Sequence, residues 1–113
     1  MKVLFHVDES AKWSLALQNV KNLVAYCEEK KDDAQIEIVA NSQAVSELSK
    51  STQTFSDEFV FLSESGVKIA ACANALRNLS IEPEQLYDFV TVVPAGVAEL
   101  AEKQEKGYGY IKP

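Results

Sequence analysis

The chain has 113 residues, of which 47% are hydrophobic and 25% are charged, and these proportions are those of a soluble globular protein. This length suits a single domain over residues 1–113 and is too short for two ordinary domains. The formal net charge of -6, with lysines and arginines scattered along the chain, argues against a nucleic-acid backbone or an anionic membrane as the main partner.

The first segments of the chain predict a buried strand followed by a helix. Residues 3–7 form a short β-branched and aromatic run, which is typical of a strand buried on both faces. Ser10 is placed to cap the helix that follows, where apolar residues recur at helical spacing as far as Cys27. We therefore expect Cys27 to face the core.

The middle of the chain predicts a second strand at 36–40, a helix at about 43–50 and then a surface loop. The segment 55–66 is ambiguous, because its apolar run has strand propensity while Ser56-Asp57-Glu58 is typical of a helix start and Gly66 of a helix stop. We expect a helix there, since a following strand that pairs in parallel with the preceding one needs a crossover.

The last part of the chain predicts two further strands and the helices between them. A strand over residues 67–71 ends at Cys72, where a helix begins, and a proline-containing turn leads to a strand over 89–93. A helix then follows Gly96, and the terminal residues form a possible fifth strand at a sheet edge. This alternation predicts an α/β fold, a three-layer α/β/α sandwich with a mostly parallel sheet of about five strands.

Ligand sites in such folds usually lie outside the carboxyl ends of the strands. We expect the side chains that follow the strands to converge there and to line a cleft. A thiol at a helix start can be stabilised as the thiolate, although cysteine is also often a packed hydrophobe. The catalytic candidate is Cys72, and the cleft-lining candidates are His6, Asp8, Asn41, Ser42, Asn74, Arg77 and Gly96.

The sequence lacks the motifs of nucleotide binding, metal binding and serine hydrolysis. The chain has neither GxGxxG nor GxxxxGK[ST], so nothing predicts a nucleotide, and no cofactor is expected. A single histidine without a cysteine pair gives no metal site, and the absence of GxSxG argues against a serine hydrolase. His6 shares a strand face with Asp8; it is either structural or, if it approaches Cys72, a promoter of thiolate formation.

The expected location is the cytoplasm. Asp8 and Glu9 interrupt the first apolar run before a secretory signal is complete, and no apolar stretch approaches the roughly 18 residues that cross a bilayer. Cys27 and Cys72 lack CxxC spacing, which fits a reducing compartment.

Three segments carry a resemblance to a known family: Gly66 to Leu76 (GVKIAACANAL), Ile81 to Glu84 (IEPE) and Gly107 to Pro113 (GYGYIKP). With the order of the elements, they resemble the DsrE/DsrF-like (YchN-like) family, in its small single-domain branch. The resemblance implies an α/β/α sandwich that assembles as a homotrimer or homohexamer, with the cysteine near a subunit boundary. It also implies sulfur carriage as a cysteine persulfide, and only Cys72 matches the reactive cysteine.

Two functions therefore remain open. The first is a cytoplasmic sulfur carrier or sulfurtransferase-like protein that holds a persulfide on Cys72 and exchanges sulfur with donor and acceptor proteins. A thiolate of lowered pKa can accept sulfane sulfur and is regenerated when a second thiol attacks. The second is a non-catalytic oligomeric module that binds a small molecule, with Cys72 merely packed.

Overall fold

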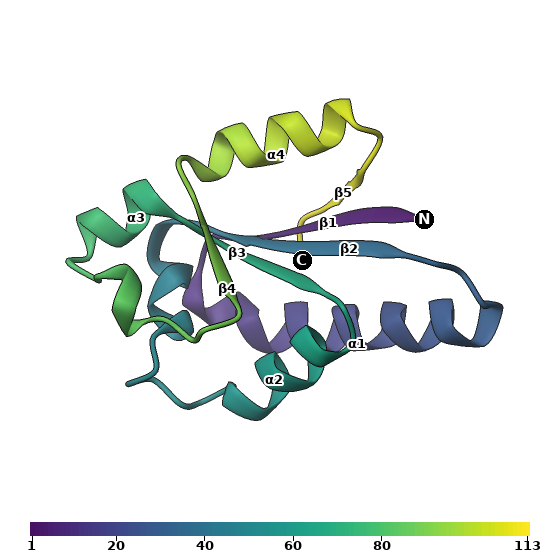
Figure 1. Cartoon of the computed structure of the whole chain (residues 1–113), viewed down its shortest axis with the longest axis horizontal. Coiled ribbons are helices and arrows are strands. Elements are labelled where there is room, and N and C mark those ends of the chain that lie inside the picture. The colour runs from purple at the N-terminus through teal and green to yellow at the C-terminus, as the bar shows by residue number, and fades with distance from the viewer.

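The computed structural model describes residues 1–113 and consists of a five-stranded sheet between two helical layers (Figure 1). The strands are β1 (Lys2–Val7), β2 (Gln35–Ala40), β3 (Lys68–Cys72), β4 (Val90–Val93) and β5 (Gly109–Ile111). The α-helices are α1 (Trp13–Lys30), α2 (Ser56–Glu64), α3 (Ala73–Asn78) and α4 (Gly96–Glu105), and the 3₁₀ helices are η1 (Ser10–Lys12), η2 (Ser42–Leu48) and η3 (Pro83–Gln85).

The strand order in the sheet is β4-β3-β2-β1-β5, and every pairing is parallel. All the strands therefore end at the same side of the sheet, which is the side of α3 and of the first turn of α4 (Figure 1). The predicted three-layer sandwich is confirmed. The terminal segment is confirmed as an edge strand, because β5 pairs only with β1.

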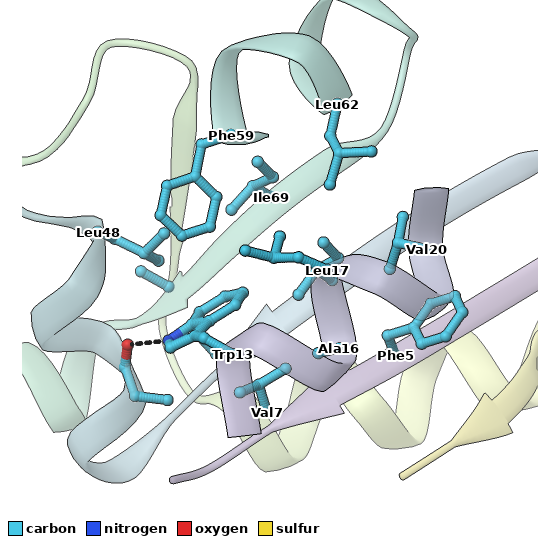
Figure 2. Packing of buried hydrophobic residues seen from close by; sticks show 14 of the residues in the cluster. Phe5, Val7, Trp13, Ala16, Leu17, Val20, Leu48, Phe59, Leu62 and Ile69 are labelled. Atoms are coloured by element: carbon cyan, nitrogen blue, oxygen red, sulfur yellow. Dashed lines mark hydrogen bonds between the residues drawn. The ribbon is translucent and has the colours of Figure 1, made fainter. Parts of the chain in front are cut away.

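Helices α1 and α2 cover one face of the sheet, and their shared core is the larger of the two (Figure 1). Trp13 lies at its centre, edge-on to Phe59 with 5.1 Å between ring centroids. The Trp13 indole N–H donates a hydrogen bond of 2.9 Å to the Ala44 carbonyl, which ties α1 to η2 (Figure 2). This bond anchors η2 directly after β2, at the edge where the strands end.

Helix α4 alone covers the opposite face, over a smaller core and a cluster of four charged side chains, of which Glu37 is buried and Lys68 is partly exposed. Glu37, in the centre of β2, is 1% exposed, and Lys103 Nζ lies 2.8 Å from its Oε1 and 3.3 Å from Glu99 Oε2. Lys68 Nζ lies 3.4 Å from Glu99 Oε2 and 3.9 Å from Glu37 Oε2. The cluster joins α4 to the two central strands.

Burial and the neighbouring Glu99 carboxylate raise the pKa of Glu37 to about 7. The pKa of Glu99 falls to about 2, because the neighbouring Glu37 carboxyl and both lysines favour its ionised form. The pKa of Lys103 is raised by the two carboxylates, against the effect of burial. The Glu37 carboxyl thus holds its proton much more firmly than the Glu99 carboxyl does.

Two local expectations are wrong and one ambiguous segment is resolved. Ser10 does not cap α1: it lies in η1, and its hydroxyl donates instead to the Gln43 carbonyl at 3.2 Å. The helix expected at about 43–50 is a 3₁₀ helix that ends at Leu48, because Ser49 pairs with Leu86 in an isolated bridge. The helix expected within 55–66 is confirmed as α2.

No helix combines the length and the apolar character that a bilayer span needs.

Candidate functional site

A pocket of about 370 Å³ lies where β2 and β3 end and where α3 and α4 begin. Its side chains come from segments that are far apart in the sequence but adjacent in the sheet. The polar and thiol-bearing lining residues are Asn41, Ser42, Gln43, Cys72, Asn74 and Asn78. The remaining lining residues are Ala75, Leu79, Ala95, Gly96 and Val97. None of the eleven carries a charge.

Cys72 is the last residue of β3 and directly precedes the first residue of α3. Its extended backbone, with ψ of 120°, ends the strand and turns the chain into the helix. The residue is 6% exposed and borders the pocket. Cys27 is 3% exposed and its sulfur packs 4.0 Å from that of Met1, as expected for a residue on the core side of α1. Only one of the two thiols therefore reaches the pocket.

Gly96 allows the first turn of α4 to approach the ends of two strands closely. A Cβ atom on Gly96 would lie 3.1 Å from the Cβ of Asn41 and 3.2 Å from the Cβ of Cys72. These separations are shorter than ordinary carbon–carbon contacts. A glycine is needed at this position because of close approach, not because of an unusual backbone angle.

His6 does not line the pocket but is one hydrogen bond away from it. Its Nε2 lies 3.0 Å from the Asn41 Oδ1, and its Nδ1 lies 2.6 Å from the hydroxyl of Tyr110 on β5. Both ring nitrogens of His6 are therefore engaged by groups other than Cys72. Any influence of His6 on the thiol passes through Asn41.

Two further candidates lie outside the pocket. The Asp8 carboxylate forms an ion pair of 3.0 Å with Lys112, and the hydrogen bond from Lys112 lowers the pKa of Asp8. Arg77 lines a neighbouring cavity beside η3 and donates a hydrogen bond to the Asn74 Oδ1. Of the predicted residues, the structure thus brings together Asn41, Ser42, Cys72, Asn74 and Gly96.

Sequence reasoning missed three contributors to this site. Gln43 and Asn78 line the pocket, and Tyr110 holds His6. The signal available for the first two is their amide side chains in the elements that directly follow β2 and β3. Tyr110 offers no comparable local signal, since it acts only through the pairing of β5 with β1. No group of three or more His, Cys, Asp or Glu side chains could hold a metal ion.

A parallel α/β/α sandwich with a cysteine at the end of its third strand, bordering a strand-end pocket, defines a distinct class of small domain. The family model described as the DsrE/DsrF-like family matches residues 1–113. The chain belongs to this family, as the resemblance of its sequence segments implied. Among curated proteins, none matches the chain.

Solved structures of similar proteins share the fold over nearly the whole chain. The protein of unknown function MTH1491 from Methanobacterium thermoautotrophicum is 33% identical, with a TM-score of 0.89, covering 99% of this chain and 98% of that one. The ychN protein from E. coli is 16% identical, with a TM-score of 0.79 and coverages of 100% and 99%. BT1422 from Bacteroides thetaiotaomicron, also of unknown function, is 17% identical, with a TM-score of 0.76 and coverages of 99% and 94%.

Proposed function

We propose that this protein is a sulfur carrier or sulfurtransferase-like protein that holds a persulfide on Cys72. The observation that carries the proposal is the position of the Cys72 thiol at the border of the strand-end pocket, while Cys27 is packed in the core. Membership of the DsrE/DsrF-like family supports it, because the family resemblance implies cysteine persulfide chemistry. From the same resemblance, we propose assembly as a homotrimer or homohexamer in the cytoplasm, with sulfur donor and acceptor proteins as partners.

The chemistry needs only a positioned thiolate. The Cys72 thiolate attacks the outer sulfur of a donor hydropersulfide, R–S–SH; a new S–S bond forms on Cys72, the S–S bond of the donor breaks, and the donor leaves as a thiolate. The proton stays on the transferred sulfur. A thiolate of the acceptor then attacks that outer sulfur and releases the Cys72 thiolate, with no net oxidation or reduction across the two steps.

The pocket favours one class of sulfur donor. Its lining contains four side-chain amides and no charged group, so it offers hydrogen bonds without a cation. A dianion such as thiosulfate would lose its hydration there without gaining an opposite charge, which is costly. A hydropersulfide attached to a thiol, with at most one charge on its outer sulfur, suits this lining better.

The proposal is tested by exposing the protein to cysteine hydropersulfide and measuring the intact mass, followed by mapping of the modified residue. We expect one added sulfur atom on Cys72 in the wild type and in Cys27→Ala, and none in Cys72→Ser. Thiosulfate supplied at the same concentration should load the protein far more slowly. Absence of an adduct on Cys72, or equal labelling of Cys27, contradicts the proposal; circular dichroism checks that each variant is folded.

The low exposure of Cys72 and the four amides of the pocket support a second candidate, a module that binds an uncharged small molecule without reacting with it. Under this alternative, Cys72 acquires no sulfur from the hydropersulfide. In a screen of uncharged small molecules by NMR, a ligand would shift the side-chain amide resonances of Asn41 and Asn74 equally in the wild type and in Cys72→Ala.

A further inference from the structure

A row of side chains crosses the ends of four neighbouring strands and leads to Cys72. Tyr110 belongs to β5, His6 to β1, Asn41 directly follows β2, and Cys72 ends β3. These four strands are consecutive in the sheet, in the order β5, β1, β2 and β3. The row therefore follows the sheet order, although its first two members, Tyr110 and His6, are 104 residues apart in the sequence.

The hydrogen bonds in this row have a definite direction. The Asn41 Oδ1 can only accept, so the Nε2–H of His6 donates to it over 3.0 Å. In a neutral imidazole the other nitrogen then accepts, so the Tyr110 hydroxyl donates to the His6 Nδ1 over 2.6 Å. A donating Tyr110 hydroxyl favours the histidine tautomer that carries its proton on Nε2, and that tautomer matches an Asn41 amide whose oxygen faces His6.

The other end of the amide and Cys72 both approach the α-carbon of Gly96. The Asn41 Nδ2 is 3.4 Å from the point where a Gly96 Cβ would stand, and the Cys72 Cβ is 3.2 Å from the same point. The only side-chain hydrogen bond of Asn41 is the one through its Oδ1, so its Nδ2 has no protein acceptor, and Cys72 Sγ does not accept from it in the unmodified thiol. The bare α-carbon of Gly96 thus leaves a free N–H donor and the cysteine close to the same point in the pocket wall.

We propose that Tyr110 and His6 are positioning residues that orient the Asn41 amide so that its Nδ2 donates a hydrogen bond to sulfur at Cys72. A fixed N–H donor stabilises an anionic sulfur, and it does so without the desolvation cost of a buried cation. The reversed amide would present its carbonyl oxygen to the thiolate and would oppose it. The role toward the thiolate is independent of the proposed function, whereas the role toward a transferred sulfur rests on it.

A double-mutant cycle tests this inference in a Cys27→Ala background, in which Cys72 is the only thiol. The rate of alkylation by iodoacetamide is measured at neutral pH for the parent, Tyr110→Phe, Asn41→Ala and the double variant. We expect Tyr110→Phe to slow alkylation roughly two- to tenfold, the equivalent of one ordinary hydrogen bond. In the Asn41→Ala background, Tyr110→Phe should have no further effect, because its action passes through Asn41.

Tyr108→Phe is the matched control, since it removes a phenol that bonds Gln35 at 3.1 Å and touches neither His6 nor Asn41. It should leave the alkylation rate unchanged. His6→Gln can accept from Tyr110 and donate to Asn41, so it should retain more of the rate than His6→Ala does. The inference is overturned if Tyr110→Phe is alkylated as fast as the parent. It is also overturned if the double variant shows the full slowing of Tyr110→Phe in addition to that of Asn41→Ala.

Persulfide formation from cysteine hydropersulfide is measured on the same variants, and it separates this inference from the proposed function. If the alkylation cycle behaves as expected but Cys72 takes up no sulfur, the positioning role stands and the sulfur-carrier proposal fails. If Cys72 takes up sulfur at the same rate in the parent and in Tyr110→Phe, and both are alkylated equally fast, the sulfur-carrier proposal stands and the positioning role fails.

Discussion

Gly96 is the residue at which α4 touches the pocket most closely. The absence of a side chain lets the helix start between the side chains of Asn41 and Cys72, where even a methyl group would meet two carbon atoms at 3.1 and 3.2 Å. Both of these neighbours lie at the ends of central strands, which cannot shift without disturbing the sheet. The geometry around Cys72 therefore depends on the absence of a Cβ atom at Gly96.

We expect Gly96→Ala to lower the free energy of unfolding by about 1–3 kcal/mol through overpacking, and to change the alkylation rate of Cys72 because the Asn41 amide is displaced. Chemical denaturation and the iodoacetamide assay measure the two effects. Gly109→Ala is the control, since its Cβ would meet only the Lys2 carbonyl oxygen, at an ordinary 3.7 Å. Equal behaviour of the two variants would show that the contact at Gly96 is unimportant.

At the scale of elements, α4 is held on the sheet by charged as well as apolar contacts. Lys103 and Glu99 on the helix meet Glu37 and Lys68 on the strands, beside the small core that contains Leu100. Such a cluster contributes less to stability than its short distances suggest, because Glu37, Glu99 and Lys103 have lost most of their hydration. Because burial and Glu99 raise the pKa of Glu37, its protonated form is favoured by folding.

This shift gives a pH dependence of definite sign. Between the unfolded pKa of about 4.5 and the folded pKa of about 7, the folded state binds more protons at Glu37 than the unfolded state does, so stability falls as pH rises. Because the pKa of Glu99 is lowered by folding, its contribution to stability changes with pH only below about pH 4.5. We expect Glu37→Gln to gain stability relative to the wild type as pH rises from 5 to 8, measured by urea unfolding. A difference that stays constant, or one of opposite sign, would show that pairing with Lys103 outweighs burial.

At the scale of the whole molecule, the strand order gives the terminal strand a role in the pocket. Because β5 lies beside β1, Tyr110 reaches His6, and the first and last strands of the chain lie side by side at one edge of the sheet. That edge remains open: β5 pairs on one side only, and Tyr110 and Ile111 are 42% and 40% exposed. Open strands and exposed apolar side chains at an edge favour coverage by another chain.

We therefore expect a mass in solution of three or six chains, in line with the homotrimer or homohexamer that the family resemblance implies. Multi-angle light scattering coupled to size exclusion measures it directly. Tyr110→Phe keeps the apolar surface and should leave the assembly unchanged, whereas Ile111→Lys should weaken it if β5 lies in the interface. A monomeric wild type at micromolar concentration would contradict the expectation.

Much of the local structure follows from the sequence. Helix α2 shows how: Phe59 and Leu62 are three residues apart and buried, while the intervening Val60 and Phe61 are exposed. The need for a crossover before a parallel strand predicted this helix despite the strand propensity of the same residues, and the helical spacing of the two buried side chains agrees with it. Two local expectations fail because of partners that are distant in the sequence. The Ser10 hydroxyl donates to the Gln43 carbonyl in η2 instead of capping α1. The pairing of Ser49 with Leu86 ends η2 before Lys50.

By itself, the sequence determined the alternation of strands and helices, the α/β/α class, the place of Cys72 at the end of β3, the packing of Cys27 and the family. These features depend on neighbouring residues and on short motifs. Only the tertiary structure decided the strand order, the row from Tyr110 through His6 to Asn41, the close approach at Gly96 and the partners of Glu37. Each of these joins residues that are distant in the chain, and local periodicity carries no record of which distant segments will lie side by side.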